Sequence, residues 1–261
     1  MSGGAFEDIR VARDGAVSVL TLNRPLARNA LRKHSLVEMI EAVRQETAGG
    51  ARALVITGEG GHFCAGADLK EMREDTVPVK EENLWKRWGP MLNNIESGPI
   101  PAIAALRGYA VAGGGEIALA CHLRIAGRST KLGLTEILRG HIPGGGGTVR
   151  LPRMVGTGQA LKYLLTGDTI DAQEAYRIGL VNDVVADEEV LDRAVALGKR
   201  IAKLSPKAVE LTLRSVMAQR DKPLAEALRF EMDLCREMRE SPDYREGLDA
   251  FIAKREPRYG K

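Results

Sequence analysis

The chain has 261 residues, of which 44% are hydrophobic, 28% are charged and 4% are aromatic, and its formal net charge is +3. This composition is typical of a globular protein with a sizeable buried core, and no apolar stretch reaches the roughly 18 residues of a membrane span. The few aromatic side chains and the weak, scattered positive charge argue against nucleic acid as a partner and are compatible with a small anionic ligand.

The cysteines and the N-terminus bear on the cellular compartment. Cys64, Cys121 and Cys235 are far apart and odd in number, so a reducing compartment is favoured over a disulfide framework. The first residues, MSGGAFEDIR, have neither the apolar run of a signal peptide nor the arginines of a transit peptide. We therefore expect a cytoplasmic protein, with the mature form of an organelle protein as the alternative. The four histidines stand at no metal-ligand spacing, and no metal site is predicted.

Up to about residue 185, short β-rich runs alternate with helical patterns. The run ARALVITG indicates a strand buried on both faces. The expected elements are, in chain order, a strand over 16–22, a helix with Leu36, Met39, Ile40 and Val43 on its apolar face, a strand over 51–58, a helix around 80–97, a strand over 101–111, a helix from Glu116 and a strand over 123–127. This alternation predicts an α/β fold with parallel strand pairing.

After about residue 187 the sequence shows helical patterns alone. The expected helices cover 188–203, 206–219, 223–238 and 242–253, and the turn signals SP, DKP and SP separate the last three from what precedes them. A helical tail on an α/β core serves as a lid or as an assembly surface. We divide the chain into an α/β core at 1–200 and a helical region at 201–261.

Two glycine-bearing turns follow buried strands and lead into helices. FCAGADLKEM (63–72) places Asp68 at a helix start, where free backbone N–H groups can bind an anion, although Asp68 alone is more simply an N-cap. VAGGGEIALAC (111–121) places Glu116 in the first turn of the next helix, where the helix dipole by itself favours a carboxylate. The glycines indicate that the backbone closely approaches another group.

The second of these turns also allows a different interpretation. Gly113, Gly115 and Ala118 satisfy G-x-G-x-x-A directly after a strand, and Glu136 lies about twenty residues on, where a dinucleotide ribose would be bound. The motif lies in mid-chain, and Glu136 follows no clean second strand. A dinucleotide-dependent enzyme is the alternative that this pattern leaves open.

Two further stretches carry candidate residues. LGLTEILRGHIPGGGGT (132–148) places Glu136 ahead of four consecutive glycines, whose entropic cost requires a reason such as close approach to a ligand or to another loop. Taken alone, Glu136 would be a solvated loop carboxylate. RPLARNAL (24–31) follows the first strand and places Arg24 and Arg28 near a turn, which by default is a solvated loop.

Together these stretches resemble one family. FCAGADLKEM, GYAVAGGGEIALAC and TEILRGHIPGGGGTVRLPRMVG, in this order and spacing, resemble the enoyl-CoA hydratase/isomerase family, the crotonases, and LNRPLARNAL and EGLDAFIAKREPRYGK resemble its termini. The resemblance implies a crotonase-like spiral of ββα repeats with a C-terminal helical trimerisation region, in a homotrimer or a dimer of trimers. Residues 1–200 would be the catalytic core and 201–261 the assembly region.

The resemblance also implies roles for individual residues. The backbone amides of Ala67 and Gly113 would form an oxyanion hole for the carbonyl of an acyl-CoA thioester. Glu116 would activate water for attack on C3, and Glu136 would supply a proton to C2. Residues implied to contact the substrate or its CoA moiety are Arg28, Ala65, Asp68, Leu69, Lys70 and Gly114, with Lys254, Arg255 and Arg258 as further candidates for the CoA phosphates. CoA is part of the substrate, and no separate cofactor is implied.

The presence of both glutamates favours hydration of a 2-enoyl-CoA, because many isomerases of the family keep only the equivalent of Glu136. The motifs look closest to hydratases that handle branched or short acyl groups, methylglutaconyl-CoA hydratase among them. An enoyl-CoA isomerase, another CoA-thioester enzyme of the family, and a non-catalytic CoA-binding or RNA-binding relative are the remaining alternatives.

Three residues depart from the family pattern. Ala112 stands where glycine is frequent, which would stiffen the loop. His122 stands where aspartate is usual and is expected to be structural. His141 stands near the acyl pocket, where small or aliphatic residues are usual, and is expected to affect the shape of the substrate that fits.

Overall fold

The computed structural model describes residues 6–74 and 84–260. Its main sheet has six strands in the order β1-β2-β3-β4-β6-β9. The strands are β1 (Ile9–Asp14), β2 (Val17–Leu22), β3 (Ala53–Gly58), β4 (Ala102–Leu106), β6 (Leu123–Gly127) and β9 (Asp183–Val185). β1 pairs antiparallel with β2, and the other neighbours pair in parallel. The parallel α/β fold expected from the sequence is therefore confirmed.

The prediction of a single strand over 101–111 is wrong in one respect. This segment forms two strands, which belong to two different sheets. β4 ends at Leu106, and Gly108 adopts a φ of +52° that ends the extended run. β5 (Tyr109–Val111) then joins a second, three-stranded sheet with β7 (Lys131–Gly133) and β8 (Ile170–Asp171). A continuous apolar run does not reveal such a break, whereas the Arg-Gly pair inside it does.

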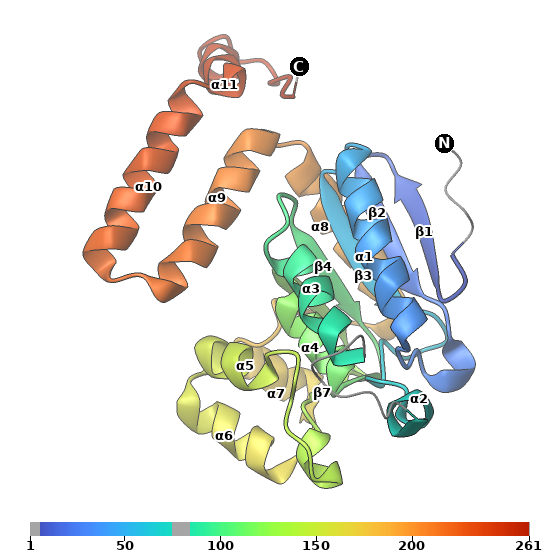
Figure 1. The fold of residues 1–261 in the computed structure, drawn as a ribbon. Coiled ribbons are helices and arrows are strands. Elements are labelled where there is room, and N and C mark those ends of the chain that lie inside the picture. The colour runs from blue at the N-terminus through green and yellow to red at the C-terminus, as the bar shows by residue number, and fades with distance from the viewer. Residues whose placement is uncertain (1–5, 75–83, 261) are drawn as a thin grey trace.

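Helices cover both faces of the main sheet (Figure 1). On one face, α1 (Lys33–Ala48) and α3 (Leu84–Glu96) pack against each other and over side chains such as Leu20 and Ile56. On the other face, α8 (Val190–Ala202) packs on Val55 and Ile103. The alternation of strand side chains between the two clusters is the period-2 pattern of a sheet buried on both faces.

Shorter elements are grouped at one end of the sheet (Figure 1). They are α2 (Leu69–Glu74), α4 (Gly113–Ala120), the 3₁₀ turn Glu136–Arg139, α5 (Gly147–Val155), α6 (Thr157–Thr166) and α7 (Ala172–Arg177). α4 begins at Gly113, three residues earlier than the start expected at Glu116. The glycines are therefore part of the helix itself, and Glu116 lies in its first turn.

The C-terminal region is helical as expected, with α9 (Pro206–Ala218), α10 (Leu224–Arg239) and α11 (Pro242–Ile252) projecting beyond the core (Figure 1). Ser205 and Ser241 cap α9 and α11, each followed by proline. The boundary expected at 200/201 falls in the last turn of α8, and the chain leaves the sheet only after Ala202. Among the residues that the structure describes, no helix combines the length and apolarity needed to cross a bilayer.

Candidate active site

A cavity of about 310 Å³ opens at the end of the sheet where the glycine-bearing turns meet. It is lined by the loop before α2, by α2 itself, by α3, by the start of α4 and by the 3₁₀ turn at Glu136. The lining residues are Ala65, Ala67, Leu69, Met72, Arg73, Trp88, Ala112, Gly113, Glu116, Glu136, Arg139 and His141. Two carboxyl groups from separate helical turns therefore share one small cavity.

Two of the residues that line this cavity have backbone amides that are free among the residues that the structure describes. Ala67 lies between Gly66, whose φ is +95°, and the start of α2, and Gly113 is the first residue of α4, which leaves its N–H without an intrahelical acceptor. Within the described ranges, neither amide donates to another protein group. The two turns touch, since a Cβ at Gly66 would lie 3.0 Å from the Gly113 nitrogen. A carbonyl oxygen in the cavity could accept from both N–H groups.

The three glycines at the start of α4 are packed against other parts of the protein. A Cβ at Gly113 would lie 2.1 Å from the Trp88 ring, one at Gly114 would lie 2.2 Å from the Cys64 carbonyl oxygen, and one at Gly115 would lie 2.6 Å from the Gly133 carbonyl oxygen. The sequence analysis inferred from these glycines that the backbone closely approaches another group. The structure shows that the groups approached include other parts of the protein, on which the helix packs too closely for a side chain.

Glu116 is 2% exposed, and three N–H donors surround its carboxylate. The amides of Gly145 and Gly147 donate to Oε1 at 2.6 and 3.0 Å. The indole Nε1–H of Trp88 donates to Oε2 at 3.1 Å. The glycine run that follows Pro143 thus supplies two of the backbone donors to this carboxylate. Four adjacent glycines permit the backbone to come this close to Glu116.

Both carboxyl groups of the cavity have raised pKa values. Burial raises the pKa of Glu116 to about 7, and the nearby charge of Glu136 adds to the rise while the three N–H donors oppose it. Burial also raises the pKa of Glu136, against opposition from its own backbone N–H and from Arg139. Within the described residues, Oε2 of Glu136 is buried and has no hydrogen-bond partner. The pair is therefore suited to hold one proton near neutral pH.

Trp88 is a residue of this site that the sequence analysis missed. It lies on α3, is 2% exposed, and contacts both Gly113 and the carboxylate of Glu116. Trp88 begins an apolar i, i+3, i+4, i+7 pattern that continues with Met91, Leu92 and Ile95, all of which are buried. This pattern places Trp88 on the buried face of α3, but it does not relate the residue to a glutamate 28 positions away. The signals available in the sequence are this apolar period and the rarity of tryptophan, two in 261 residues.

The residues expected to bind substrate or CoA have different surroundings. Ala65 and Leu69 line the cavity, whereas Gly114 is buried and does not line it. Lys70 is exposed on α2, outside the cavity lining. The guanidinium of Arg28 lies over the ring of Tyr109, 5.7 Å from its centroid.

Asp68 does not line the cavity, although it follows Ala67 directly. Its carboxylate accepts from the Lys70 amide at 3.1 Å, which is the N-cap contact expected of it, and from Arg24 at 2.9 Å. These two bonds hold the pKa of Asp68 below its usual range in spite of partial burial, which acts to raise it.

The basic C-terminal candidates lie at the other end of the chain. Lys254, Arg255 and Arg258 follow α11, which Figure 1 shows far from α2 and α4. Arg255 pairs with Glu246 at 2.6 Å, and the Arg258 amide donates to the same carboxylate. Within one chain these residues are too distant to contact a ligand in the cavity.

The two unusual histidines have different environments. His122 accepts from the Ala102 amide through Nδ1 at 2.9 Å, so its Nε2–H donates to the Glu96 carbonyl at 3.1 Å. Burial lowers its pKa, and both ring nitrogens are used in backbone contacts, as a structural role requires. His141 lines the cavity and contacts the Ile142 carbonyl.

The geometry does not fit a dinucleotide site at the chance motif. Gly113, Gly115 and Ala118 all lie within α4 and are buried. Trp88 and the Gly133 carbonyl fill the space in front of the two glycines. The turn therefore lacks the open backbone that a pyrophosphate would need.

Comparison with known proteins gives consistent matches over nearly the whole chain. A family model described as enoyl-CoA hydratase/isomerase matches residues 12–261. A probable enoyl-CoA hydratase of Bacillus subtilis is 41% identical over 253 residues, which is 96% of this chain and 98% of that protein. The 2,3-dehydroadipyl-CoA hydratase of Escherichia coli is 37% identical over 97% of this chain and 98% of its own length. The crystal structure of an enoyl-CoA hydratase from Bacillus anthracis superposes with a TM-score of 0.92 at 36% identity, covering 97% of this chain and 99% of that one.

Proposed function

The chain belongs to the enoyl-CoA hydratase/isomerase family, and from this premise we propose that it is an enoyl-CoA hydratase, which adds water reversibly across the C2=C3 double bond of a 2-enoyl-CoA thioester. The observation that carries the proposal is the pairing of Glu116 and Glu136 in one cavity bordered by two available amides. Double-bond isomerisation requires one carboxyl group to shuttle a proton, whereas hydration by this route uses two.

Glu116 is the base that activates water. All three of its hydrogen-bond partners are N–H donors, so the ionised carboxylate is the form that they stabilise. None of these three contacts offers an acceptor for the proton of a neutral Glu116. With a pKa of about 7, the group is a base whose strength suits proton transfer near neutral pH.

Glu136 is the acid that protonates C2. Its buried, unpartnered Oε2 can carry a proton toward a ligand without breaking an existing protein contact. In the forward direction Glu116 takes one proton from water as the water oxygen bonds to C3. The π electrons move to the thioester oxygen to form an enolate, which then takes the proton of Glu136 at C2. Exchange of one proton between the two carboxyl groups restores the starting state.

The enolate oxygen is stabilised by the amides of Ala67 and Gly113. A donor directed at an oxyanion contributes roughly 3–4 kcal/mol to transition-state stabilisation, as measured by removing one. The N-terminal end of α4 adds its positive dipole at the same point. The cavity, at the low end of the sizes usual for small-molecule sites, favours a short or branched acyl group.

The reaction proposed here requires no cofactor beyond the CoA of the substrate and no metal. We expect a reducing, cytoplasmic setting, since Cys64, Cys121 and Cys235 are free. We also expect a homotrimer or a dimer of trimers assembled through the C-terminal helices. In such an assembly the basic residues after α11 could reach the CoA of a neighbouring subunit, which they cannot do within one chain.

The test compares two isosteric variants on a panel of linear and branched 2-enoyl-CoA substrates. Glu116→Gln and Glu136→Gln are each expected to lower kcat for hydration by about 10²–10⁴-fold. The measurements are loss of the enoyl-thioester absorbance and, by mass spectrometry, uptake of deuterium at C2 from heavy water. Glu174→Gln, which alters a carboxylate paired with Arg177 outside the cavity, is the control and should be active.

The outcomes separate the alternatives. A wild-type protein that hydrates no member of the panel refutes the hydratase. A Glu116→Gln variant that isomerises 3-enoyl substrates at the wild-type rate and loses nothing in hydration refutes the two-glutamate mechanism and favours an isomerase with Glu136 alone.

A further inference from the structure

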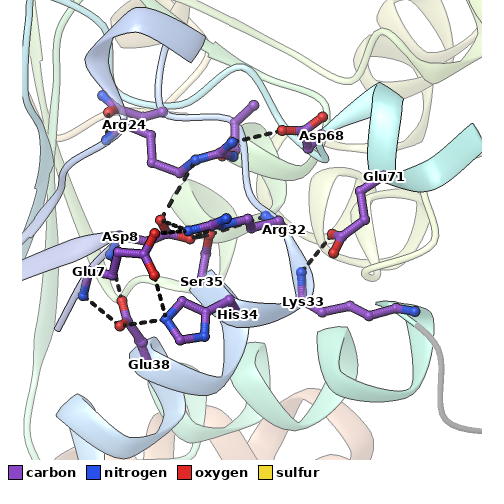
Figure 2. A network of polar contacts seen from close by, with 12 residues as sticks. Glu7, Asp8, Arg24, Arg32, Lys33, His34, Ser35, Glu38, Asp68 and Glu71 are labelled. Atoms are coloured by element: carbon purple, nitrogen blue, oxygen red, sulfur yellow. Dashed lines mark hydrogen bonds and ion pairs between the residues drawn. The ribbon is translucent and has the colours of Figure 1, made fainter. Parts of the chain in front are cut away.

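Figure 2 shows a network of charged and polar residues that includes Asp68, the residue that follows the cavity-lining Ala67. It joins the entry to β1, the loop after β2, the start of α1 and the start of α2. None of its members Glu7, Asp8, Arg24, Arg32, Ser35, Glu38 and Asp68 lines the cavity. The network is thus outside the catalytic machinery described above but touches the segment that bears one of its donors.

Leu31 holds the backbone on both sides of Ala67. The Leu31 amide donates to the Gly66 carbonyl at 2.8 Å, and the Asp68 amide donates to the Leu31 carbonyl at 2.8 Å. The Ala67 N–H takes part in neither bond and borders the cavity. The position of this N–H therefore depends on how the segment at Leu31 and the segment at Asp68 are held together.

Arg24 connects these two segments through its side chain. One guanidinium nitrogen donates to the carbonyl of Ala30, next to Leu31, and another donates to Oδ2 of Asp68 at 2.9 Å. The Arg24 side chain is 22% exposed and that of Asp68 17%. A planar guanidinium with fixed donor directions is suited to set such a distance, whereas a flexible lysine is not.

Asp8 holds Arg24 from behind. Asp8 is 3% exposed, and Arg32 donates to its two oxygens at 2.7 and 2.8 Å. The Ser35 hydroxyl donates to the same carboxylate, whose Oδ1 lies 3.7 Å from Nε of Arg24. Burial acts to raise the pKa of Asp8, but these partners outweigh it and hold the pKa below its usual range, so the carboxylate is charged.

We propose that Arg24 and Asp68 are positioning residues, which fix the Ala67 amide at the distance from the Gly113 amide that a thioester oxygen requires. This inference rests on the proposed function, since it concerns the donor that the hydratase would use. An oxyanion donor contributes only when its direction is set before the charge develops, and a displacement of about 1 Å can cost about 10²-fold in rate. Asp68 thereby acts through Ala67 and has no contact with the substrate.

The experiment removes the ion pair while keeping the helix cap. Asp68→Asn retains a side-chain oxygen for the Lys70 amide, because asparagine caps helices as well as aspartate does. Asp183→Asn on strand β9 is the matched control. Like Asp68, Asp183 accepts from an arginine side chain, that of Arg193 at 2.8 Å, and from a backbone amide, that of Val184 at 3.0 Å. Arg24→Gln and Arg24→Lys test the other member of the ion pair. Lysine keeps the positive charge but lacks the two guanidinium nitrogens that contact Ala30 and Asp68.

Two readouts are taken on the full chain. In steady-state hydration, Asp68→Asn and Arg24→Gln should lower kcat about 10-fold, short of the 10²–10³-fold loss of a whole donor, with KM changed little. The second readout is the absorbance of bound 4-dimethylaminocinnamoyl-CoA, which moves to longer wavelength when the thioester carbonyl is polarised. Its shift should shrink in both variants and be intermediate in Arg24→Lys, while Asp183→Asn keeps the wild-type shift and rate.

The opposite results overturn the inference. A wild-type kcat and a wild-type absorbance shift in Asp68→Asn would show that the ion pair does not position the donor. A raised KM at unchanged kcat would show that Asp68 binds substrate instead. Failure of the proposed function is distinguishable, because the probe need not be hydrated. A wild-type protein that shifts the probe but hydrates nothing refutes the hydratase, and the variants still decide the role of Asp68.

Discussion

Helices α4 and α10 differ in burial and in composition, and therefore in what stabilises them. Every residue of α4 is buried, and three of its eight residues are glycine. α10 has sixteen residues, contains no glycine, and buries only Leu234. Its apolar side chains Leu224, Leu228 and Met232 are 75%, 52% and 54% exposed.

The contrast shows two ways of forming a helix. Three glycines cost α4 about 3 kcal/mol in helix propensity relative to alanine, so its conformation is imposed by the packing around it. α10 is rich in strong helix formers and depends less on such packing, and its exposed apolar stripe is suited to contact with a partner. Catalytic groups belong on the first kind, because packing that forces a helix to form also fixes its side chains.

The largest effect is expected from breaking the packing of α4. In Gly114→Ala the new Cβ would lie 2.2 Å from the Cys64 carbonyl oxygen, and backbone cannot move aside cheaply. We expect a loss of about 3 kcal/mol or more in the free energy of unfolding, measured in urea. Gly158→Ala in α6 is the control, since no atom lies within 4 Å of its Cβ, and it should be neutral or stabilising. Equal effects of the two changes would show that α4 is not tightly constrained.

The next effect concerns the exposed stripe of α10. Leu228→Glu with Met232→Glu places two charges on the face that we assign to assembly. We expect the proposed trimer or dimer of trimers to dissociate, which would be seen as a lower mass in size-exclusion chromatography with light scattering, while the free energy of unfolding of the core changes little. Glu226→Lys, on the opposite side of the helix, should keep the wild-type mass. An unchanged mass in the double variant would exclude this stripe from the interface.

The two regions also differ in how well the sequence predicted them. The C-terminal helices were predicted nearly residue by residue, because period-3.6 patterns and Ser-Pro starts are local signals. Around the cavity the sequence indicated the helix starts and both glutamates. It gave no sign of the contact of Trp88 with Glu116, nor of the network through Arg24, which was taken for a solvated loop. Both are contacts between segments distant in the chain, which only the packed fold creates.

A smaller effect is expected when the Trp88 donor is removed. Trp88→Phe keeps an aromatic ring against Gly113 but deletes the N–H that favours ionised Glu116. The pKa of Glu116, about 7 in the folded protein, should rise by up to about one unit. Because the base must be ionised, kcat/KM decreases as the pH falls through this pKa, and in the variant the decrease should begin at a higher pH than in the wild type. The pH profile of kcat/KM measures the shift, and an unchanged acid limb would contradict the role given to the indole.

The smallest effect is expected at the residue that caps α4. Ala112 has φ 51° and ψ −126°, a conformation favourable only to glycine, and it is held there by bonds from its N–H to Gly133 and from the Glu116 amide to its carbonyl. Relief of this backbone strain in Ala112→Gly should raise the free energy of unfolding by about 1–3 kcal/mol. Two opposing effects should together lower the free energy of unfolding by about 1.5 kcal/mol: glycine makes the unfolded chain more flexible, and the buried methyl group is lost.

The net result should be a stabilisation of about 0.5 kcal/mol, seen as a small rise in Tm. Ala110→Gly serves as the control, since Ala110 is fully buried in β5 at an ordinary negative φ and has no strain to relieve. It should destabilise the protein by about 1 kcal/mol or more. If both changes destabilise equally, the bonds to Ala112 hold it without strain, and the glycine frequent at this position in the family has another cause.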